Sequence, residues 1–588
     1  MKGFYGRVLR IDLGRETYTI EEVGDEILGK YLGGKGLASY LLYENNPTGV
    51  DPLDPANCLI IATGPVTGSN IWGSCRYGVF TKSPQTGFYA ESYCGGRVPE
   101  AIDSAGFDAI VILGKSRKPA VLSIHPEGAD FHEADAIWGM DTHRAEDAVH
   151  AKFGRLRNGF KKSGVVVIGP AGENLVRFSV IESDYWRSAG RTGVGTVMGS
   201  KKLKAILFQG DRSRALHDPE TVRTFSNSSI EKGRESSGAK AYKALGTPMM
   251  VKIMNQVKAF PTRYWSEGSC GHWEKISAEA LHERCDVKPH ACLKCFLACG
   301  RMTKVLQGRH SGLKLEGPEY ETIYAFGGLC LVDSIEEIAY LNDICDRLGM
   351  DTITAGNLCA FTIEAARQGK VDYPIDYGDV DAIADLLHKI AGREGIGNVL
   401  AEGIRTAARE WDLEDFAVHV KGLEPAGYDP RVLKGMGLGY ATSDRGACHL
   451  RSTFYKPELS GMIDPAEIEG KAEIFVDFED RLTIFDTLIL CRFYRDLYTW
   501  EKLGEMVKMV TGMNTSIEGL KSSASAISNL VRKFNLREGM QPEDDLLPKG
   551  FHKALKGSGS VITEEELDYM LKDYYRLRGW DDKGRIPA

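Results

Sequence analysis

Three cysteines in one short segment are the residues of this chain best suited to carry chemistry. Cys292, Cys295 and Cys299 lie in the run 290–300 with the spacing C-x2-C-x3-C. Thiolate sulfur is the preferred ligand of iron–sulfur clusters and of zinc, and this spacing lets one loop supply three ligands. No second C-x2-C pair follows, as a structural zinc site would require. We predict a cluster whose fourth ligand lies elsewhere, with zinc or reduced structural cysteines as the alternatives.

A segment dense in glycine and cationic side chains runs from residue 187 to residue 204, RSAGRTGVGTVMGSKKLK. Glycine lets backbone N–H groups approach an anion closely, and arginine presents paired donors to phosphate oxygens. The segment matches neither the P-loop nor a clean dinucleotide fingerprint. It predicts either a cradle for a bulky phosphorylated cofactor or a glycine-rich connector with solvated lysines.

Two more segments share the pattern D-x-x-x-hydrophobic-D/C, namely 346–351 (DRLGMD) and 486–491 (DTLILC). Asp346 and Asp486 are each able to accept hydrogen bonds from the N–H edge of a heterocycle. The second segment ends in Cys491, which makes that residue a candidate for the missing fourth thiolate. The alternative for both aspartates is an ordinary role in capping helices.

The elements that must position these residues change in kind along the chain. Strand patterns broken by glycine dominate the first part, at 8–13, 58–66, 107–113, 120–125, 164–168, 176–182 and 205–209. Helical spacing of apolar residues follows, at 219–232, 335–348, 352–368, 380–392, 398–410 and 564–577. The patterns predict an α+β fold. A β-rich N-terminal domain (1–211), which would bind the cofactor, precedes two mainly α-helical domains (212–427 and 428–588).

Composition restricts the class of protein. The chain has 588 residues, 43% of them hydrophobic and 26% charged, with a formal net charge of −8. That charge argues against nucleic acid or an anionic membrane as the main partner. No apolar run approaches the roughly 18 residues of a transmembrane helix, and the N-terminus reads as a strand, not a signal peptide. Thirteen scattered cysteines are unlike a secreted disulfide scaffold, so we predict a reducing, cytoplasmic location.

Taken together and in this order, these elements resemble the tungsten-dependent aldehyde:ferredoxin oxidoreductase family, the tungstopterin oxidoreductases. The likeness extends over essentially the whole chain. Besides 187–204, the matching blocks are GRVLRIDL (6–13), YLGGKGL (31–37), ATGP (62–65), GPEYE (317–321), SDRGACHLR (443–451), FNLREG (534–539) and YYRLRGWD (574–581).

The resemblance implies tungsten or molybdenum held by two pterins, a [4Fe–4S] cluster beside it, and Mg²⁺ bridging the pterin phosphates. The cluster ligands fall on Cys292, Cys295, Cys299 and Cys491. The residues implied in binding the pterins are Arg76, Tyr93, Gly95, Arg187, Ser188, Gly190, Asp346, Met350, Asp351, Arg451, Asp486 and Leu490. Burying several phosphate charges demands arginines and close backbone amides, because unpaired buried charge is prohibitive.

The family's catalytic glutamate and histidine map to Glu319, with Glu321 as the less favoured choice, and to His449. A base that activates water and a donor that polarises the carbonyl are each worth about 10²–10⁴-fold in rate. The alternatives are a carboxylate on the surface or in the first turn of a helix for Glu319, and a structural role for His449.

The chain departs from the family pattern at several positions. The glycine expected in the second aspartate motif is Ile489, and Tyr93 stands where some members have asparagine. Tyr340 and Asp343 replace the E-x-x-H pair of an intersubunit metal site, so that metal is not expected.

The resemblance therefore implies an enzyme that oxidises aldehydes to carboxylic acids. Electrons would pass through the cluster to ferredoxin or an iron–sulfur partner subunit, in an anaerobic setting and an oligomer or multi-subunit complex. The alternatives are the catalytic subunit of a low-potential reductase, such as an aromatic acyl-CoA ring reductase, and a zinc-bound non-catalytic subunit.

Overall fold

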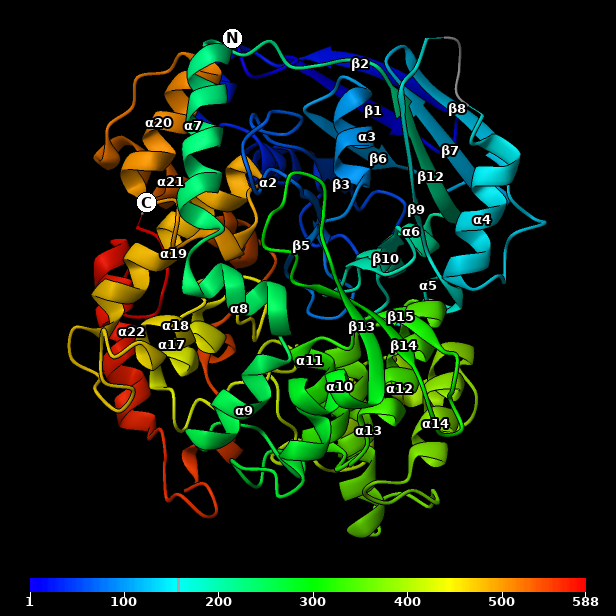
Figure 1. Cartoon of the computed structure of the whole chain (residues 1–588), viewed down its shortest axis with the longest axis vertical. Helices are drawn as coiled ribbons and strands as arrows, with labels where there is room; N and C mark the ends of the chain where they lie inside the picture. The colour runs from blue at the N-terminus through cyan, green and yellow to red at the C-terminus, as the bar shows by residue number, and fades with distance from the viewer. Residues whose placement is uncertain (156–158, 588) are drawn as a thin grey trace.

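The computed structural model describes residues 1–155 and 159–587. Figure 1 shows the blue to cyan strands in the upper part of the molecule, most of the green helices below them, and the yellow to red helices at the left. The N-terminal sheets therefore form a base against which two groups of helices pack. This arrangement confirms the predicted α+β fold, with the strands concentrated in the first 210 residues.

The first sheet has six strands in the order β2-β1-β6-β3-β4-β5. Their bounds are β1 Arg7–Asp12, β2 Thr17–Glu22, β3 Leu59–Ala62, β4 Tyr77–Lys82, β5 Tyr89–Cys94 and β6 Ala109–Leu113. β1 and β6 run parallel and the other pairs are antiparallel. All residues of β3 and β4 are buried. This explains the unbroken apolar pattern of β3, because a strand covered on both faces shows no alternation.

The second sheet has the order β11-β10-β9-β12-β7-β8. Its strands are β7 Ala120–His125, β8 Gly128–Glu133, β9 Lys162–Val167, β10 Ile181–Ser183, β11 Arg187–Ala189 and β12 Leu203–Gly210. One core cluster contains Ile11 and Ile110 of the first sheet together with Ile206 of the second. The two sheets therefore share a hydrophobic core, and their edge strands β5 and β11 also lie in contact.

Helices make up most of the remaining chain. The α-helices are α1 Asp25–Tyr31, α2 Gly34–Asn45, α3 Val98–Ser104, α4 Thr142–Phe153, α5 Pro170–Glu173, α6 Val194–Ser200, α7 Pro219–Gly233, α8 Ser237–Leu245, α9 Met249–Gln256, α10 Ala278–Arg284, α11 Tyr320–Ile323, α12 Ile335–Leu348, α13 Thr352–Arg367, α14 Val380–Gly392, α15 Ile396–Ala401, α16 Ile404–Glu410, α17 Lys434–Thr442, α18 Tyr455–Leu459, α19 Lys471–Leu488, α20 Trp500–Thr511, α21 Ile517–Arg537 and α22 Glu564–Arg578.

A small third sheet of strands β13 Cys285–His290, β14 Gly300–Val305 and β15 Lys314–Glu316 was not predicted. β13 and β14 are antiparallel, and His290 pairs with Gly300 at the end of the ladder next to the connecting loop. The three predicted cluster cysteines therefore all lie in the loop of one β-hairpin. The predicted helix 398–410 is two helices, α15 and α16, which meet at Gly403 with a φ of 86°. Only 181–182 of the predicted strand 176–182 are in a strand.

The largest hydrophobic cluster includes Leu387 and Ala408 as well as Tyr440 and Phe475, so it extends across residue 427. A second cluster joins α19 and α20 to the first sheet, with Ile60 packing among Leu488 and Leu503. The boundaries predicted at 211 and 427 stay predictions.

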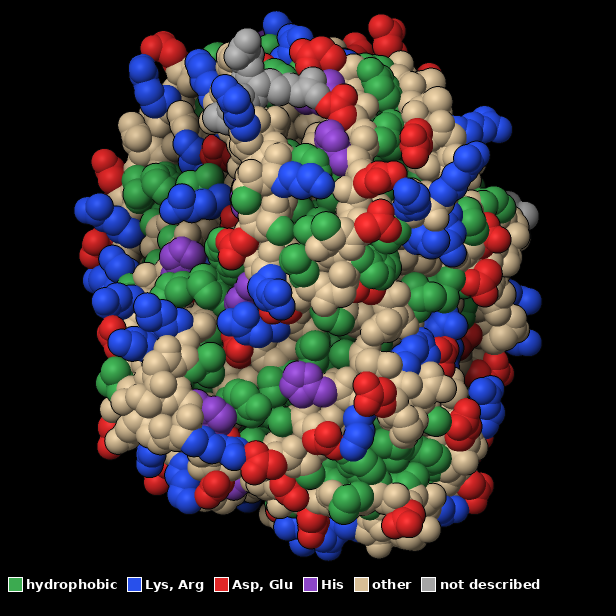
Figure 2. Space-filling view, turned by 90° about the vertical axis from the view of Figure 1, so that its right-hand side faces the viewer, with side chains coloured by type: hydrophobic (Ala, Val, Ile, Leu, Met, Phe, Trp, Pro, Cys, Tyr) green, Lys and Arg blue, Asp and Glu red, His purple; other side chains and the backbone are tan. Residues whose placement is uncertain are grey.

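The face in Figure 2 shows Lys and Arg side chains interspersed with Asp and Glu and no large field of one sign. Among residues 1–155 and 159–587, no helix is long and apolar enough to cross a membrane.

Candidate cluster and cofactor site

The hairpin loop that carries three cysteines meets Cys491 at Gly73. The Gly73 N–H donates to the carbonyl of Lys294, and the Gly73 carbonyl accepts from the Cys491 N–H, both at 2.8 Å. The Phe296 N–H donates to the Tyr494 hydroxyl at 3.1 Å. Burial, followed by the charges of Cys491 and Cys292, raises the pKa of Cys295 to about 11. The structure therefore brings Cys491 to the 292–299 loop.

A fifth thiol, Cys75, also lies in this group. Its side chain hydrogen-bonds to Cys292, and this bond together with burial raises the pKa of Cys75. The sequence analysis did not select Cys75, because one buried cysteine is usually a small hydrophobe. Gly95 lies directly against the loop, since a Cβ there would stand 2.8 Å from Cys292 Sγ.

Arg76 is placed among the same thiols. Burial acts to lower the pKa of Arg76, but the charges of Cys491, Cys75 and Cys292 outweigh it and raise that pKa. A guanidinium there compensates thiolate charge. Among the described residues, no group of three His, Cys, Asp or Glu side chains is arranged to hold a single metal ion.

The first aspartate motif lies at the end of α12, where Gly349 takes up a left-handed conformation with a φ of 77°. Asp346 accepts a hydrogen bond from Asn342 Nδ2 at 2.7 Å. Burial raises the pKa of Asp346 well above its ordinary value, and the nearby carboxylates Glu182 and Asp343 raise it further. Its surroundings therefore favour the protonated form of Asp346.

Met350 and Asp351 follow. Met350 is buried, and Ser179 pairs with it in an isolated β-bridge. Asp351 caps α13 by accepting from the Ile353 N–H at 3.0 Å, and it accepts from Arg191 Nε at 2.9 Å. The capping role considered for the aspartates is thus observed at Asp351.

The glycine-rich segment folds as β11, a turn and α6. Arg187 pairs with Glu316, and Ser188 donates to Glu182 Oε1 at 2.6 Å. Gly190 follows directly, in the turn after β11. Burial lowers the pKa of Arg187, but Cys292 and Glu316 raise it more, so the net shift is upward. The segment therefore lies between the cysteine loop and the first aspartate motif, as a cofactor cradle would.

The second aspartate motif lies at the end of α19, where Ile489 has a left-handed φ of 61°. Asp486 pairs with Arg451 at 3.1 Å and also with Arg492. Burial alone would raise the pKa of Asp486, but the guanidiniums of Arg492 and Arg451 hold it below its ordinary value. The next motif residue, Leu490, is buried and its N–H donates to the Phe485 carbonyl at 2.8 Å.

Tyr93 connects this motif to β5. Its hydroxyl donates to Glu91 Oε2 at 2.6 Å. The guanidinium carbons of Arg451 and Arg492 lie 5.6 and 5.7 Å from the centre of its ring. Tyr93 therefore supports the two arginines through its π face.

Several arginines of the site have buried N–H donors without a hydrogen-bond partner. These free donors are what an anionic cofactor would need. The buried atoms lacking a hydrogen-bond partner include Arg187 Nε, Arg445 Nε, Arg451 Nε and Nη2, Arg492 Nη1 and Arg495 Nε. Burial and the neighbouring Arg492 lower the pKa of Arg451 to about 10. A buried donor left unpaired is costly, so the arrangement fits anionic groups such as the phosphates of a pterin cofactor.

The predicted catalytic residues do not all meet. His449 Nε2 lies 3.4 Å from Glu321 Oε1, whereas Glu319 accepts from the Thr247 hydroxyl. Glu319 instead neighbours the cluster loop, since its charge is among those that raise the pKa of Cys299. The local pattern PEYE could not decide between the two glutamates, because they are only two residues apart, Glu319 at the N-cap of α11 and Glu321 in its first turn.

Glu321 and His449 have distinctive protonation properties. Burial raises the pKa of Glu321 to about 7. Burial, together with Arg191 and Arg445, lowers the pKa of His449 well below its ordinary value. Glu321 Oε1 and His449 Nδ1 are buried without a hydrogen-bond partner. The ring of Tyr428 lies 5.7 Å from that of His449.

The structure also shows residues that the sequence analysis missed. Arg191 binds Asp351 and donates to the carbonyls of Glu424 at 2.9 Å and Ala447 at 3.2 Å. Arg445 and Arg492 lie within or next to segments already selected, so their position in the sequence was a usable signal. At the former intersubunit metal positions, Tyr340 stacks on His310 at 4.1 Å and Asp343 pairs with Arg347 at 2.8 Å.

The site thus consists of clustered thiols and of arginines with unpartnered buried donors, between a β-rich base and two sets of helices. The chain belongs to the aldehyde ferredoxin oxidoreductase family. The family's N-terminal domain matches residues 8–210, and its domains 2 and 3 match residues 225–588. The family resemblance stated from the sequence is thereby confirmed.

The chain is similar to the tungsten-containing aldehyde ferredoxin oxidoreductases of Thermococcus kodakarensis and Pyrococcus furiosus. The identities are 36% and 34%, and each alignment covers 100% of this chain and 98% of the relative. Among solved structures, a chain of the active-site complex of benzoyl coenzyme A reductase superposes with a TM-score of 0.86. That match covers 100% of this chain and 96% of the other, at 23% identity, and it shows the fold alone.

Proposed function

We propose that this protein oxidises aldehydes to carboxylic acids, using tungsten or molybdenum held by two pterins and a [4Fe–4S] cluster. The single observation that carries the proposal is the convergence of Cys491 with the 292–299 loop next to buried arginines with unpartnered donors. Membership of the family and the full-length similarity to tungsten-containing aldehyde ferredoxin oxidoreductases support it.

The residues present fit the proposed groups. Cys292, Cys295, Cys299 and Cys491 would ligate the cluster, with Arg76 beside it. Arg187, Ser188, Gly190 and Asp346 would hold one pterin, and Arg451, Asp486 and Leu490 the other. Mg²⁺ between the phosphates, a reducing cytoplasm, an iron–sulfur acceptor and an oligomeric state also belong to the proposal.

The bound cofactor would accept two electrons as aldehyde and water become carboxylic acid and two protons. Glu321 is the group that takes a proton from the attacking water, because its pKa of about 7 leaves a usable fraction ionised at neutral pH. Burial and the neighbouring arginines favour the neutral form of His449. Its buried Nδ1 has no hydrogen-bond partner, so in the tautomer protonated there it would donate to the aldehyde oxygen. This assignment replaces Glu319 with Glu321 as the base.

Metal analysis of the anaerobically purified protein tests the cofactors. We expect iron together with tungsten or molybdenum, and loss or conversion of the cluster spectrum in Cys491→Ser, because a hydroxyl is a poor substitute for a thiolate ligand. One zinc without iron, tungsten or molybdenum would instead establish the non-catalytic alternative.

Two assays separate the possible reactions. We expect aldehyde-dependent reduction of a viologen dye. Reduction of an aromatic coenzyme A thioester without aldehyde oxidation would establish the low-potential reductase alternative in its place.

The catalytic base is tested by Glu321→Gln. We expect kcat to fall by about 10²–10⁴-fold. In the parent we expect activity to fall below about pH 7 as Glu321 becomes protonated, and in the variant we expect this pH dependence to be absent. Glu319→Gln is the matched control, because the same change lies two residues away on a side chain turned toward Thr247. A larger loss in the Glu319 variant would contradict the assignment.

A further inference from the structure

The cysteine loop is the part of the cluster site nearest the surface. Leu293 is 37% exposed, and Cys292, Cys295 and Cys299 are half-buried, whereas Cys491 is buried. Glu321 and His449, at the other side of the site, have buried polar atoms. Electrons that reach the cluster therefore have their shortest way out through this loop.

A groove begins beside that loop. Its inner part, of about 110 Å³, is lined by Phe296, Leu297 and Tyr494 together with Tyr242 of α8. Tyr494 hydrogen-bonds to Cys295, which contributes to the pKa of that tyrosine being raised. The ring of Phe296 packs edge-on against Tyr494 at 5.0 Å. The floor of the groove thus contacts a proposed cluster ligand.

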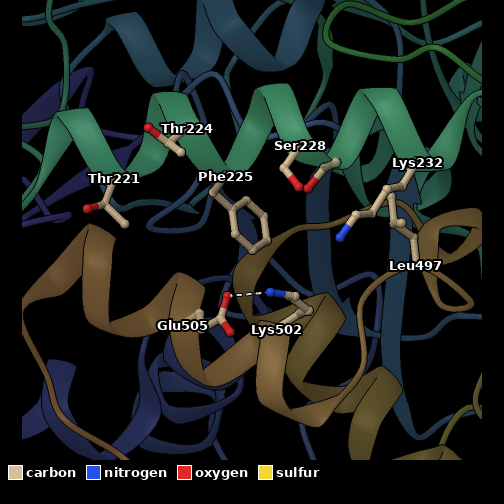
Figure 3. A pocket seen from close by; sticks show the side chains of 9 residues that line it. Thr221, Thr224, Phe225, Ser228, Lys232, Leu497, Lys502 and Glu505 are labelled. Atoms are coloured by element: carbon tan, nitrogen blue, oxygen red, sulfur yellow. Dashed lines mark hydrogen bonds and ion pairs between the residues drawn. The ribbon is translucent and has the colours of Figure 1, made fainter.

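The outer part of the groove, of about 360 Å³, lies between α7 and α20 and shares Lys232 and Leu497 with the inner part. In Figure 3 the ring of Phe225 points from α7 toward α20, between Lys502 and Ser228. Lys502 Nζ lies 5.5 Å from the centre of that ring. The groove therefore has an apolar centre with polar side chains around it, the usual composition of a protein interface.

The rim of this groove is positively charged in a chain of net charge −8. Lys232 at the end of α7 and Lys243 at the end of α8 are exposed. Neither lysine forms an ion pair with another of the described residues. Lys294, on the cysteine loop, bonds only to the neutral side chain of Asn70 at 2.8 Å.

The carboxylates in the groove do not reverse this charge. Glu505 pairs with Lys502 at 2.7 Å, and Asp496 pairs with Lys456 at 3.0 Å. Glu231, exposed on α7, offsets one lysine. The surface around the cluster loop remains net positive.

We propose that this groove, between α7, α8, α20 and the cysteine loop, is the docking surface for a small acidic iron–sulfur protein that accepts the electrons. The inference rests on the proposed function. Encounters of electron-transfer proteins bury little surface, below about 1,200 Å², and complementary charge steers their association. The groove matches such a partner because it has an apolar centre, a rim of lysines and a position next to Cys295.

The test uses the full-length holoenzyme and an acidic ferredoxin with two [4Fe–4S] clusters as the probe. The variant is Lys232→Glu with Lys243→Glu. We expect its KM for ferredoxin to rise about tenfold at low salt, within the range over which charge changes alter association rates. Aldehyde-dependent viologen reduction should stay unchanged, because a small dye needs no docking surface. High salt should shrink the difference between variant and parent.

Lys553→Glu is the matched control, because Lys553 is exposed, has no ion pair among the described residues and lies outside the groove. An unchanged ferredoxin KM in the double variant, or an equal rise in Lys553→Glu, would overturn the docking surface. A changed sedimentation coefficient of the double variant in the absence of ferredoxin would also overturn it, because the groove would then be a contact between copies of this chain.

The docking surface and the proposed reaction can be tested independently of each other. Direct titration of ferredoxin binding to parent and double variant measures docking without turnover, and we expect weaker binding by the variant. Binding affected as expected, with no aldehyde oxidation, would reject the reaction and retain the surface. Normal aldehyde oxidation with equal ferredoxin binding would reject the surface and retain the reaction.

Discussion

The two aspartate motifs end their helices alike but have opposite electrostatic surroundings. Asp346, on α12, lies near the carboxylates Glu182 and Asp343, and its pKa is raised. Asp486, on α19, pairs with Arg451 and Arg492, and its pKa is lowered. One six-residue pattern thus gives one aspartate whose protonated form is favoured and another whose ionised form is favoured. The charge state is decided by segments distant in the sequence.

The two motifs share their way of docking on the N-terminal base. A Cβ on Gly169 would lie 2.3 Å from the Leu348 carbonyl oxygen, and one on Gly34 would lie 2.4 Å from the Asp486 carbonyl oxygen. Each helix end therefore requires a glycine opposite it, because any side chain would overlap the backbone. The two aspartate motifs therefore share the backbone geometry of their helix ends but differ in the charges around the aspartate.

The largest expected effect comes from Asp486→Asn. The substitution leaves Arg451 and Arg492 buried without the carboxylate that they share. Breaking a buried ion pair by removing one partner costs about 3–5 kcal/mol. We expect a clear fall in the thermal unfolding midpoint and in the bound tungsten or molybdenum per chain. The same change at Asp346 is the matched control, and equal losses in both variants would contradict the contrast between the motifs.

The backbone at the ends of the two helices gives the next prediction. Gly349→Ala adds a Cβ at a φ of 77° and 2.9 Å from the Gly169 nitrogen. The left-handed conformation alone costs about 1–2 kcal/mol, so we expect a loss of about 2 kcal/mol in the free energy of unfolding.

Ile489 holds the same left-handed conformation with a buried side chain. Ile489→Gly relieves about 1–2 kcal/mol of strain but removes apolar contacts worth about 2–5 kcal/mol when a large aliphatic side chain is truncated. We expect a net loss, measured by denaturant unfolding of both variants. A stabilised Ile489→Gly would show that strain outweighs burial there.

The sequence was informative wherever periodicity was strong. The predicted helix 335–348 is α12 residue for residue, and the predicted strand 120–125 is β7. In contrast, the hairpin β13–β14 was missed because β13 is mostly not buried. A strand that buries few of its side chains need not carry the apolar pattern from which a strand is predicted.

Long-range pairing explains what the sequence could not supply for the site. The choice of Glu321 over Glu319 depends on His449, more than a hundred residues further along the chain. The role of Arg492 depends on Asp486 and Tyr93, which come from different parts of the fold. Residue types were therefore identified from the sequence, whereas their partners required the three-dimensional structure.

The smallest expected effect comes from Asp346→Asn. The raised pKa of Asp346 means that the folded protein favours its protonated form, which asparagine matches in charge, and asparagine can still accept from Asn342. We expect the free energy of unfolding to change by at most about 1 kcal/mol at pH 4, comparable to one hydrogen bond.

The pH dependence of stability should also differ between the parent and the variant. A group whose pKa is raised in the folded state contributes stability that is complete below its unfolded-state pKa and is lost as pH rises toward its folded-state pKa. The variant, which lacks this titration, should therefore gain stability relative to the parent between pH 4 and pH 7. Unfolding midpoints at both pH values measure this, and a relative gain on acidification would mean that Asp346 is ionised in the folded protein.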